Sequence, residues 1–481
     1  MNRHLYPYDL ILKAEHETFK LTESYEVMKK AAFACYDYIK NKFSNKKFLI
    51  FCGPGNNGGD GILIAKYLLQ AGHRVEISFP VSKPKTPDSV RAISELNNEK
   101  IINEIPDLDN YDIIIDAIFG TGLKYKISDP LCKLINAINY SNKIVISIDM
   151  PSGININTGK FFKTAVRSSE TLTFHRFKPG QWLLPGKKYC GKITIMDIDL
   201  KDLDSESKIQ LNYVENLPEP KISQHKFDRG SCVIIGGKKL VGASKLAFLA
   251  ASQSALRSGA GLCSLFVEES QKNIFRPHIL EEMIVEYNNL DELKENILNY
   301  RINSIIYGCG IENDSNNIEI LEFLIKSEID LVLDASVFSM VMQNKSYFID
   351  LLKNRNAQSI LTPHEGEFKK MFNISDNKIQ DALKASRMTN TVVVYKGNDT
   401  VIASPKGDVI INYETSPYLA TAGSGDVLAG IIGGLISNYK DPFKAAKIGC
   451  YIHSKCALKL GAGLIAGDLI KLIPTVIKEI K

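Results

Sequence analysis

The sequence predicts an α/β protein built as two domains in series, and three observations support this. From Lys47 onward, short runs rich in β-branched residues alternate with longer segments whose apolar residues have helical spacing. Residues 201–224 interrupt the alternation, because there the composition turns polar and two prolines occur. The alternation resumes at residue 231 and continues toward the C-terminus. We therefore expect residues 1–205 and 224–481 to form separate three-layer domains, each a sheet covered by helices.

Composition and charge exclude several other classes of protein. The 481 residues are 44% hydrophobic and 23% charged, as in ordinary globular proteins. The net charge of +5 is small and no basic run stands out, so we expect no nucleic-acid partner. No apolar run approaches about 18 residues, so no membrane span is expected. Charges at Asp9, Lys13 and Glu15 argue against a signal peptide.

Nine cysteines are scattered along the chain without a CxxC pair or a zinc-type cluster. Several lie inside apolar runs, as Cys232 does in "SCVIIGG". Buried reduced thiols of this kind are typical of cytosolic proteins, and we expect a cytoplasmic location.

In the first domain, three apolar runs predict strands of a parallel sheet covered on both faces. They are "KFLIF" (47–51), "DIIID" (112–116) and "KIVISID" (143–149). Each run leads into a loop with glycine and polar residues, which in a parallel sheet would share the carboxyl edge where ligands bind.

The loop after the first of these strands, "CGPGNNGGDG" (52–61), is the most unusual stretch of the chain. We expect Gly53, Gly55, Gly58 and Gly59 to allow positive φ angles and close approach of a ligand. The next helix is expected to begin near Asp60, so that its free N–H groups face the loop and suit phosphate. The stretch is not a dinucleotide GxGxxG in register, and it is not a P-loop, because no GK(S/T) follows. Taken alone, it fits tight packing as well as it fits a binding site.

Four motifs in order extend this interpretation: "GPGNNGGDG", "DAIFGTGL", "IDMPSG" and "TLTFHRFKPGQWLLPGKKYCGKITIMDIDL". Together they resemble the N-terminal domain of the NAD(P)H-hydrate (NAD(P)HX) epimerases over roughly residues 10–200, with "VMKKAAF" where that family often has an MENAG-like stretch. The resemblance implies a Rossmann-like parallel sheet that exchanges the R and S hydrates.

The same resemblance implies site residues. The hydrated dinucleotide would contact Asn56, Asn57, Gly58, Gly59, Asp60, Gly120, Thr121, Gly122, Leu123, Lys124, Tyr125, Lys126 and Asp149. A potassium ion, which prefers oxygen ligands, would be held by Asn57, Asp116 and Ser152. Asp149 would act in acid–base catalysis beside Lys124, although Lys124 fits a solvated surface lysine equally well.

In the second domain, "ATAGSGDVLAG" (420–430) predicts a glycine turn that opens a buried helix. Backbone N–H groups at such a helix start can bind a transferring phosphoryl group, with Asp426 placed to take a proton from the acceptor hydroxyl. An aspartate that merely caps the helix is the alternative.

Further motifs favour the catalytic interpretation: "GAGL" (259–262), "VLDAS" (332–336), "TPHEGEF" (362–368) and "YKGNDTVIASPKG" (395–407). Their order resembles the ribokinase-like family over about residues 224–475, and its NAD(P)H-hydrate dehydratases most closely. The chain departs from that pattern at "KKLVGAS" (238–244) and "YGCGIEN" (307–313).

This resemblance implies that Asp426 is the catalytic base in the second domain. The adenine nucleotide would be bound by Lys396, Gly397, Asn398, Asp399, Thr400 and Gly425. The hydrated nicotinamide would be contacted by Ala243, Gly310, His364 and Asp426.

The two resemblances together imply a bifunctional enzyme that repairs NADHX and NADPHX, with potassium in the first domain and Mg²⁺ with ADP in the second. We also expect a homo-oligomer. Two other functions stay open: a small-molecule vitamin-precursor kinase with a dinucleotide-binding regulatory domain, and a first domain that is only a scaffold.

Overall fold

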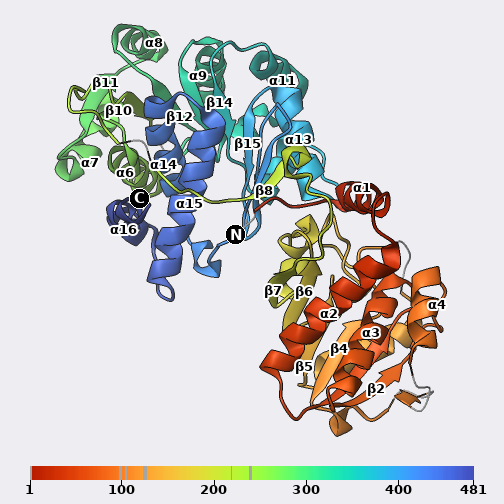
Figure 1. Ribbon diagram of the computed structural model, residues 1–481. Helices are drawn as coiled ribbons and strands as arrows, with labels where there is room; N and C mark the ends of the chain where they lie inside the picture. The colour runs from red at the N-terminus through yellow and green to blue at the C-terminus, as the bar shows by residue number, and fades with distance from the viewer. Residues whose placement is uncertain are drawn as a thin grey trace. The chain divides into compact units, whose positions relative to one another are not determined.

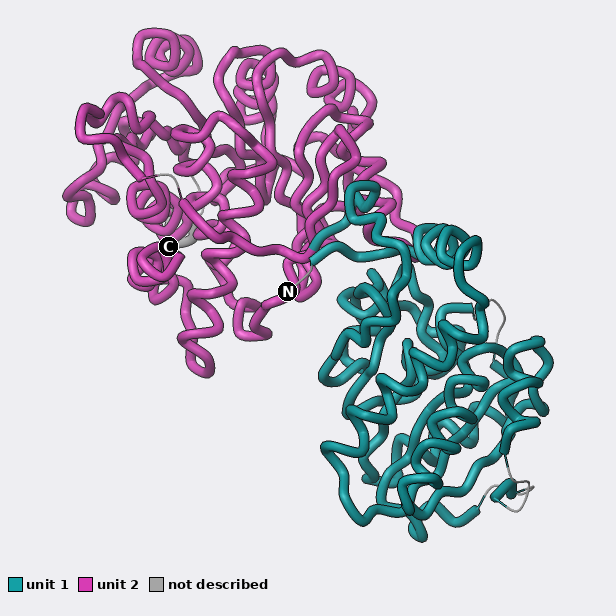
Figure 2. The backbone as a smooth tube through the Cα atoms, in the orientation of Figure 1, with its two compact units in different colours: residues 1–210 teal, residues 211–481 magenta. Residues whose placement is uncertain are grey.

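The protein consists of two compact units, residues 1–210 and 211–481 (Figure 2). A computed structural model describes residues 3–96, 100–102, 106–122, 127–217, 219–237 and 241–480. The division between the units falls inside the polar stretch 201–224. Each unit is an α/β structure with its own sheet (Figure 1).

The sheet of the first unit has seven strands in the order β3-β2-β1-β4-β5-β6-β7, and all neighbouring pairs are parallel. In chain order the strands are β1 (Lys47–Cys52), β2 (Arg74–Ser78), β3 (Ile101–Ile102), β4 (Ile113–Ala117), β5 (Ile144–Ile148), β6 (Glu170–Phe174) and β7 (Lys192–Met196). The order reverses between β1 and β4, which is the switch point where ligands bind in sheets of this type. The predicted Rossmann-like parallel sheet is confirmed.

Helices cover both faces of this sheet. They are α1 (Tyr8–Phe19), α2 (Ser24–Lys42), α3 (Asn56–Gln70), α4 (Pro87–Ser94) and α5 (Asp129–Tyr140). Alternate residues of β1 enter different cores, because side chains on a strand point to opposite faces. Phe48 and Ile50 pack with residues of α2 and α3, whereas Leu49 and Phe51 pack with residues of α5.

The glycine loop differs from its prediction in two ways. Helix α3 begins at Asn56, four residues before the predicted start near Asp60, so residues 56–61 of the quoted stretch are helical. The predicted positive φ angles at Gly53, Gly55, Gly58 and Gly59 are wrong, since none of these residues adopts one. Close packing requires the glycines instead: a Cβ at Gly53 would lie 1.8 Å from the Ile118 carbonyl oxygen, and one at Gly58 would lie 1.9 Å from the Gly53 carbonyl oxygen.

The sheet of the second unit has ten strands in the order β11-β10-β9-β12-β13-β14-β15-β16-β17-β8. In chain order they are β8 (Ile209–Leu211), β9 (Ser231–Ile235), β10 (Leu262–Glu268), β11 (Met283–Tyr287), β12 (Ser304–Tyr307), β13 (Asp330–Leu333), β14 (Ser359–Leu361), β15 (Val392–Tyr395), β16 (Thr400–Ala403) and β17 (Val409–Asn412). The pairs from β11 to β15 are parallel, while β15–β16 and β16–β17 are antiparallel. The motif at 395–407 therefore runs from the end of β15 through the antiparallel strand β16.

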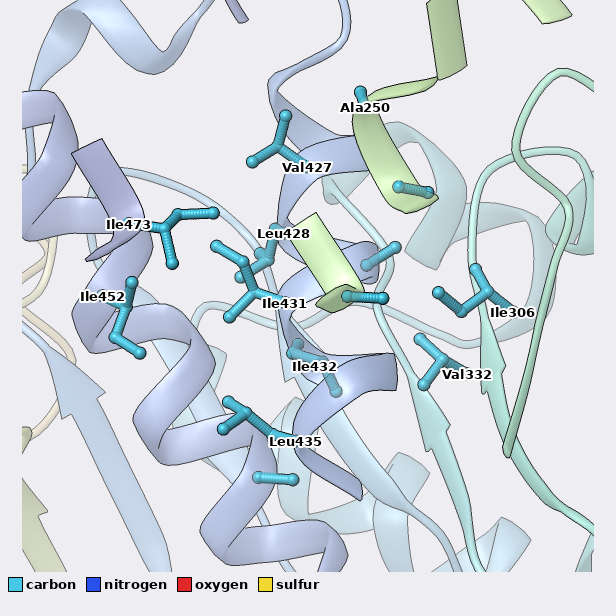
Figure 3. Packing of buried hydrophobic residues seen from close by; sticks show 14 of the residues in the cluster. Ala250, Ile306, Val332, Val427, Leu428, Ile431, Ile432, Leu435, Ile452 and Ile473 are labelled. Carbon is cyan, nitrogen blue, oxygen red and sulfur yellow. The ribbon is translucent and has the colours of Figure 1, made fainter. Parts of the chain in front are cut away.

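The helices of this unit are α6 (Val241–Ser258), α7 (Lys272–Phe275), α8 (Leu290–Asn299), α9 (Ser315–Lys326), α10 (Val337–Met340), α11 (Lys345–Lys353), α12 (Glu365–Met371), α13 (Lys378–Thr389), α14 (Ser424–Tyr439), α15 (Pro442–Leu460) and α16 (Ala466–Glu479). Helix α14 is the centre of the main core (Figure 3). Its apolar side chains, including Ile431 and Ile432, pack among residues of α6, α15, α16 and the sheet. The start of α14 is thereby fixed at the edge of the sheet.

Glycine lets α14 and α6 approach closely, which gives a first prediction. A Cβ at Gly430 would lie 2.3 Å from the Ala251 carbonyl oxygen, so Gly430→Ala should destabilise the second unit by about 1–3 kcal/mol. We expect the transition temperature of the second unit, measured by calorimetry, to fall by about 2–4 °C per kcal/mol of destabilisation. Gly467→Ala is the matched control, because Gly467 also lies in a helix but has nothing within 4 Å of its missing Cβ. An equal loss in both variants would contradict the packing argument.

The cysteines form no disulfide, and eight of the nine are buried, as predicted. Within the described ranges, no helix combines the length and apolar character that crossing a bilayer requires.

Candidate active sites

In the first unit, polar side chains from neighbouring strand ends meet at the carboxyl edge of the sheet. Asp116, near the end of β4, accepts hydrogen bonds from the Ser152 Oγ at 2.5 Å and the Ser152 N–H at 2.9 Å. It also accepts from the Ser147 Oγ at 2.7 Å and the Ile118 N–H at 3.3 Å. The structure therefore brings together two of the three predicted potassium ligands.

Asp116 is fully buried, and its hydrogen-bond donors are all neutral. Burial raises the pKa of this carboxyl, although the hydrogen bonds from Ser152 and Ser147 oppose the rise. Among the residues that the structure describes, this carboxyl has no cationic partner to compensate a buried negative charge. A cation bound at this position would supply that charge.

The third predicted potassium ligand, Asn57, lies in the first turn of α3 and faces the neighbouring loops. With its amide oriented to satisfy its neighbours, the nitrogen donates to the Ile148 carbonyl at 3.1 Å and the oxygen accepts from the Gly120 N–H at 3.3 Å. A Cβ at Gly120 would lie 3.1 Å from Asn57 Oδ1 and 3.3 Å from Asp149 Oδ2. Asn57, Gly120 and Asp149 therefore form one wall of the site.

Asp149 directly follows β5 and carries a left-handed backbone, with φ of 66°. Its Oδ1 accepts a hydrogen bond from the Lys178 ammonium at 2.6 Å. Lys178 was quoted in the sequence motif "FKPG" but was not predicted as a site residue. No chain-local pattern marks it, because its partner is 29 positions away.

Burial and the negative charge of Asp149 raise the pKa values of two neighbouring carboxyls. Burial, helped by Asp149, raises the pKa of Glu15 in α1 to about 7. Burial together with Asp149 and Glu15 raises the pKa of Asp60 well above its ordinary value. Glu15 was not predicted, because helix α1 lies outside the quoted motifs.

The remaining predicted residues of the first unit differ in their exposure to solvent. Gly58 and Gly59 are buried within α3, whereas Asn56 and Gly122 are exposed. Thr121 is partly exposed beside Gly122. Leu123, Lys124, Tyr125 and Lys126 lie outside the described residues.

In the second unit, Asp426 lies in the first turn of α14, and Gly423 before the helix has φ of 85°. Burial and the neighbouring Asp334 raise the pKa of Asp426 to about 6. The Cys309 thiol hydrogen-bonds to the carboxyl, and Lys396 attracts it, and both oppose the rise. Asp426 is therefore a partly buried carboxyl with a raised pKa, unlike a solvated helix cap.

Lys396, which follows β15, links this carboxyl to the neighbouring strands. Its ammonium lies 2.7 Å from Asp334 Oδ1 and 3.8 Å from Glu367 Oε2. Asp334 and Glu367 are both buried, and burial raises the pKa of Glu367. A Cβ at Gly425 would lie 3.4 Å from the Lys396 ammonium, so glycine leaves room for this ion pair.

A cavity of about 440 Å³ opens beside this cluster. Its walls include five of the predicted nucleotide-binding residues and one predicted substrate residue: Lys396, Gly397, Asn398, Thr400, Gly425 and His364. The other walls are formed by Asn412, Thr415, Leu419, Ala420, Thr421, Ser424, Leu428, Cys450, His453 and Ser454. The sequence did not predict these as site residues, and the structure brings them together from β17, α14, α15 and the loop before α14.

Four predicted residues of this unit are not among the described residues of the cavity wall: Asp399, Gly310, Ala243 and Asp426, which lies next to the wall residue Gly425. The Asp399 side chain is buried and paired with the Lys378 ammonium at 2.5 Å. Gly310 has φ of 68°, and its carbonyl oxygen would lie 2.4 Å from a Cβ at Gly237. Ala243 belongs to α6, and its side chain is outside the described atoms.

The two histidines at the cavity have different roles. His364 caps α12. Its ring Nδ1 accepts a hydrogen bond from the backbone N–H of Glu367 at 3.2 Å, and its backbone N–H donates to Glu367 Oε2 at 2.8 Å. Buried His453 lies 2.9 Å through Nε2 from the Ser424 carbonyl oxygen. Burial lowers the pKa of His453 to about 4, so this ring is neutral at neutral pH and its Nε2 carries the donated proton.

Comparison with known proteins places the chain in a family. The family described as NAD(P)H-hydrate dehydratase matches residues 231–478, and the YjeF-related protein N-terminus matches residues 24–180. A bifunctional NAD(P)H-hydrate repair enzyme of Dictyoglomus turgidum is 32% identical over 94% of this chain and 94% of its own. The chain belongs to the bifunctional NAD(P)H-hydrate repair enzymes. A bifunctional NAD(P)H-hydrate repair enzyme of Archaeoglobus fulgidus is 30% identical over 98% of this chain and 97% of its own.

Membership of the bifunctional NAD(P)H-hydrate repair enzymes confirms the predicted family and the prediction that the chain is an enzyme. The fold of the second unit has a solved counterpart in a ribokinase-like superfamily protein of Enterococcus faecalis. That structure has a TM-score of 0.50 and 20% identity, and the match covers 59% of this chain and 98% of that one. The predicted ribokinase-like fold is thereby confirmed. Neither alternative, a vitamin-precursor kinase or a scaffold, is supported by these relatives of the chain.

Proposed function

We propose that this repair enzyme epimerises the R and S forms of NADHX and NADPHX in its first unit, and dehydrates the S form in its second unit with ADP as phosphoryl donor. The proposal for the second unit depends chiefly on Asp426, whose pKa is raised to about 6 at the N-terminus of α14, beside the ion pair of Lys396 and Asp334. The class of substrate follows from family membership. The proposed acid–base step follows from the cluster of Asp426, Lys396 and Asp334.

Dehydration would proceed by phosphorylation and elimination. The hydroxyl of the hydrated ring gives its proton to Asp426, its oxygen forms a bond to the terminal phosphorus of ADP, and the phosphoanhydride bond breaks to release AMP. The ring C–O bond then breaks, phosphate leaves with the bonding electrons, and loss of a ring proton restores the double bond. Phosphate is a better leaving group than hydroxide, so a kinase fold suits a dehydratase.

The remaining residues of the cavity would bind and orient the reactants. Lys396, Gly397, Asn398, Thr400 and Gly425 would hold the nucleotide phosphates, with the helix N-terminus contributing N–H groups. Asp399 would stabilise that loop through Lys378. Mg²⁺ would neutralise charge on the transferring phosphates, and buried Asp334 and Glu367 are carboxylates of the type it prefers. His364, Gly310 and Ala243 are proposed to line the nicotinamide side.

In the first unit, Asp149 would transfer protons as the hydroxyl-bearing ring carbon exchanges configuration. The α3 turn from Asn56 to Asp60 and the loop from Gly120 to Lys126 would bind the dinucleotide. Lys124 would assist Asp149. A potassium ion would be held by Asn57, Asp116 and Ser152, because all three offer the oxygen ligands that it prefers. The charge also fits, because the Asp116 carboxyl is buried among neutral hydrogen-bond donors.

The pKa of Asp426 gives a pH prediction. A general base works only when ionised, and the pKa of Asp426 is raised to about 6. We expect the rate of dehydration to be constant above about pH 7 and to fall toward tenfold per pH unit below pH 6. The measurement is kcat with S-NADHX and ADP between pH 5 and pH 9. A rate that stays constant down to pH 5 would contradict Asp426 as the base.

Potassium binding predicts a salt-specific stability of the first unit. Its unfolding can be followed by the fluorescence of Trp182, the only tryptophan of the chain. KCl should raise the transition temperature above that in equimolar tetramethylammonium chloride, since an ion at a hundredfold excess over its Kd stabilises by about 2.7 kcal/mol. Asp116→Asn should remove the difference. Identical transitions of the unsubstituted chain in both salts would argue against the ion.

One assay tests both proposed activities. The chain is mixed with R- and S-NADHX, ADP and Mg²⁺, and recovery of the absorbance of NADH is followed. Full recovery supports both activities, whereas recovery of the S fraction alone contradicts epimerisation. No recovery contradicts dehydration, and transfer of phosphate to a vitamin precursor would restore the kinase alternative.

Three further predictions accompany the proposal. A cytoplasmic location can be checked by fractionation of cells. A homo-oligomer can be checked by sedimentation of the purified chain. The expected absence of a nucleic-acid partner can be checked by mobility shift with mixed DNA and RNA.

A further inference from the structure

Lys178 is a cationic side chain that is almost completely buried at the proposed epimerase site. It is 1% exposed, yet its ammonium has three oxygen acceptors: Asp149 Oδ1 at 2.6 Å, Thr173 Oγ1 at 2.7 Å and the Phe174 carbonyl at 2.8 Å. Burying an ammonium is costly unless it is paired and fully hydrogen-bonded. The three acceptors satisfy its three protons.

The same short segment also holds the backbone of Asp149. Buried Gln181 accepts from the Lys178 N–H at 2.9 Å, and its amide donates to the Asp149 carbonyl at 3.1 Å and to Thr173 Oγ1 at 2.9 Å. Asp149 itself has a left-handed backbone, with φ of 66°. Such a conformation is unfavourable for a residue with a side chain, and it persists only where its surroundings impose it. Residues 178–181 therefore hold both the backbone and the side chain of Asp149.

The contacts are divided between the two carboxylate oxygens of Asp149. Oδ1 receives the Lys178 ammonium, the Thr173 hydroxyl at 3.4 Å and the Phe174 N–H at 3.3 Å. Oδ2 lies on the side of Gly120, 3.3 Å from where a Cβ of that residue would be. One oxygen is thus anchored in the protein, and the other faces the loop proposed to hold substrate.

We propose that Lys178 is a positioning residue for epimerisation: its ammonium anchors Oδ1 of Asp149 and so directs Oδ2 toward the substrate. The inference rests on the proposed role of Asp149. Other titratable groups that act on Asp149 are Glu15 from α1, Asp60 from α3 and Cys35 from α2. None of the three is cationic, so within the described part of the chain the positive charge in this group comes from Lys178.

The test compares Lys178→Met with Lys178→Arg in the full chain. Conversion of purified R-NADHX to the S form is measured by chromatography without ADP, so that dehydration does not interfere, and the spontaneous rate is subtracted. We expect Lys178→Met to lower kcat at least about tenfold and to move the acid limb of the pH profile up by about 1–3 units, because the carboxylate loses its cationic neighbour. Lys178→Arg, which keeps the charge, should keep the limb in place and recover part of kcat.

A purely structural role predicts the opposite order. Methionine matches the apolar stem of lysine and removes a buried charge, whereas the forked guanidinium of arginine is larger. If only packing mattered, the Met variant would be more active than the Arg variant and its pH profile would not move. That result would overturn the proposal.

Lys30→Met is the matched control, because Lys30 pairs with Asp199 at 2.7 Å, and Asp199 also has a left-handed backbone but lies exposed. It should leave kcat and the pH profile of epimerisation unchanged. If Lys178→Met does not fold, as judged by Trp182 fluorescence, the double variant Lys178→Met/Asp149→Asn removes both buried charges. In that case the Lys178→Arg variant alone tests the proposal. If this variant folds but its epimerase activity is no higher than that of the double variant, the proposal is overturned. If the unsubstituted chain itself fails to epimerise, the proposed function fails instead.

Discussion

Asp426→Asn is expected to lower the rate of dehydration about a thousandfold while the same chain still epimerises NADHX. A positioned general base contributes roughly 10²–10⁴-fold, and Asn has the same shape but accepts no proton. The measurement is kcat for S-NADHX with ADP, with R-to-S conversion measured on the same sample. The epimerase rate shows that the chain is intact.

Stability separates a catalytic loss from a folding defect in this variant. Burial and Asp334 raise the pKa of Asp426, so the folded chain binds this proton more tightly than the unfolded chain does. Its contribution to stability therefore declines as pH rises through about 6. Asn removes that unfavourable buried charge, so above pH 7 the melting temperature of the second unit should not fall.

The matched control for Asp426 is Asp468→Asn. Asp468 is the third residue of α16, as Asp426 is of α14, but it lies 3.4 Å from the Lys471 ammonium at the surface. It should leave dehydration unchanged. If Asp426→Asn kept more than about a tenth of the rate, another group would have to be the base.

Asp149→Asn is expected to have the complementary effect: epimerisation falls at least about a hundredfold, and dehydration of S-NADHX continues. In the recovery assay, the S fraction alone should then return to NADH. The neutral amide also leaves the buried Lys178 ammonium without its carboxylate, so some loss of stability of the first unit should accompany the loss of activity.

Asp199→Asn provides the control for Asp149. Both aspartates have left-handed backbones and both pair with a lysine, but the Asp199 side chain is 70% exposed and its ion pair should contribute little. It should retain full epimerase activity. If Asp149→Asn, while folded, stopped both reactions, the assignment of one reaction to each unit would be wrong.

Much of the fold could be predicted because the strands are continuous apolar runs. "KFLIF", "DIIID" and "KIVISID" became β1, β4 and β5, and their polar successors meet at one edge of the sheet. In a parallel sheet, residues that follow equivalent strand ends must lie near one another. That rule predicts that Asp116 and Ser152 lie at the same edge, and the structure places them in hydrogen-bond contact.

Predictions that depended on local backbone geometry were less successful. Glycine permits positive φ, but it also permits close contact, and the sequence "GPGNNGGDG" does not distinguish the two. The structure shows close contact at Gly53 and Gly58, and a helix that begins at Asn56. Asp399 shows a similar limit: the nucleotide-loop motif contains it, yet its side chain turns to Lys378 and lies outside the cavity wall.

The sequence by itself determined two α/β units, the apolar strands that form their sheets, and the glycine and aspartate motifs at the strand ends, because these features depend on residues close together in the chain. Only the tertiary structure decided which distant groups act on those motifs. Lys178 reaches Asp149 across 29 positions, and Lys396 reaches Asp334 across 62. Electrostatic effects of this kind depend on distance in space and on exclusion of water, and neither can be read from chain position.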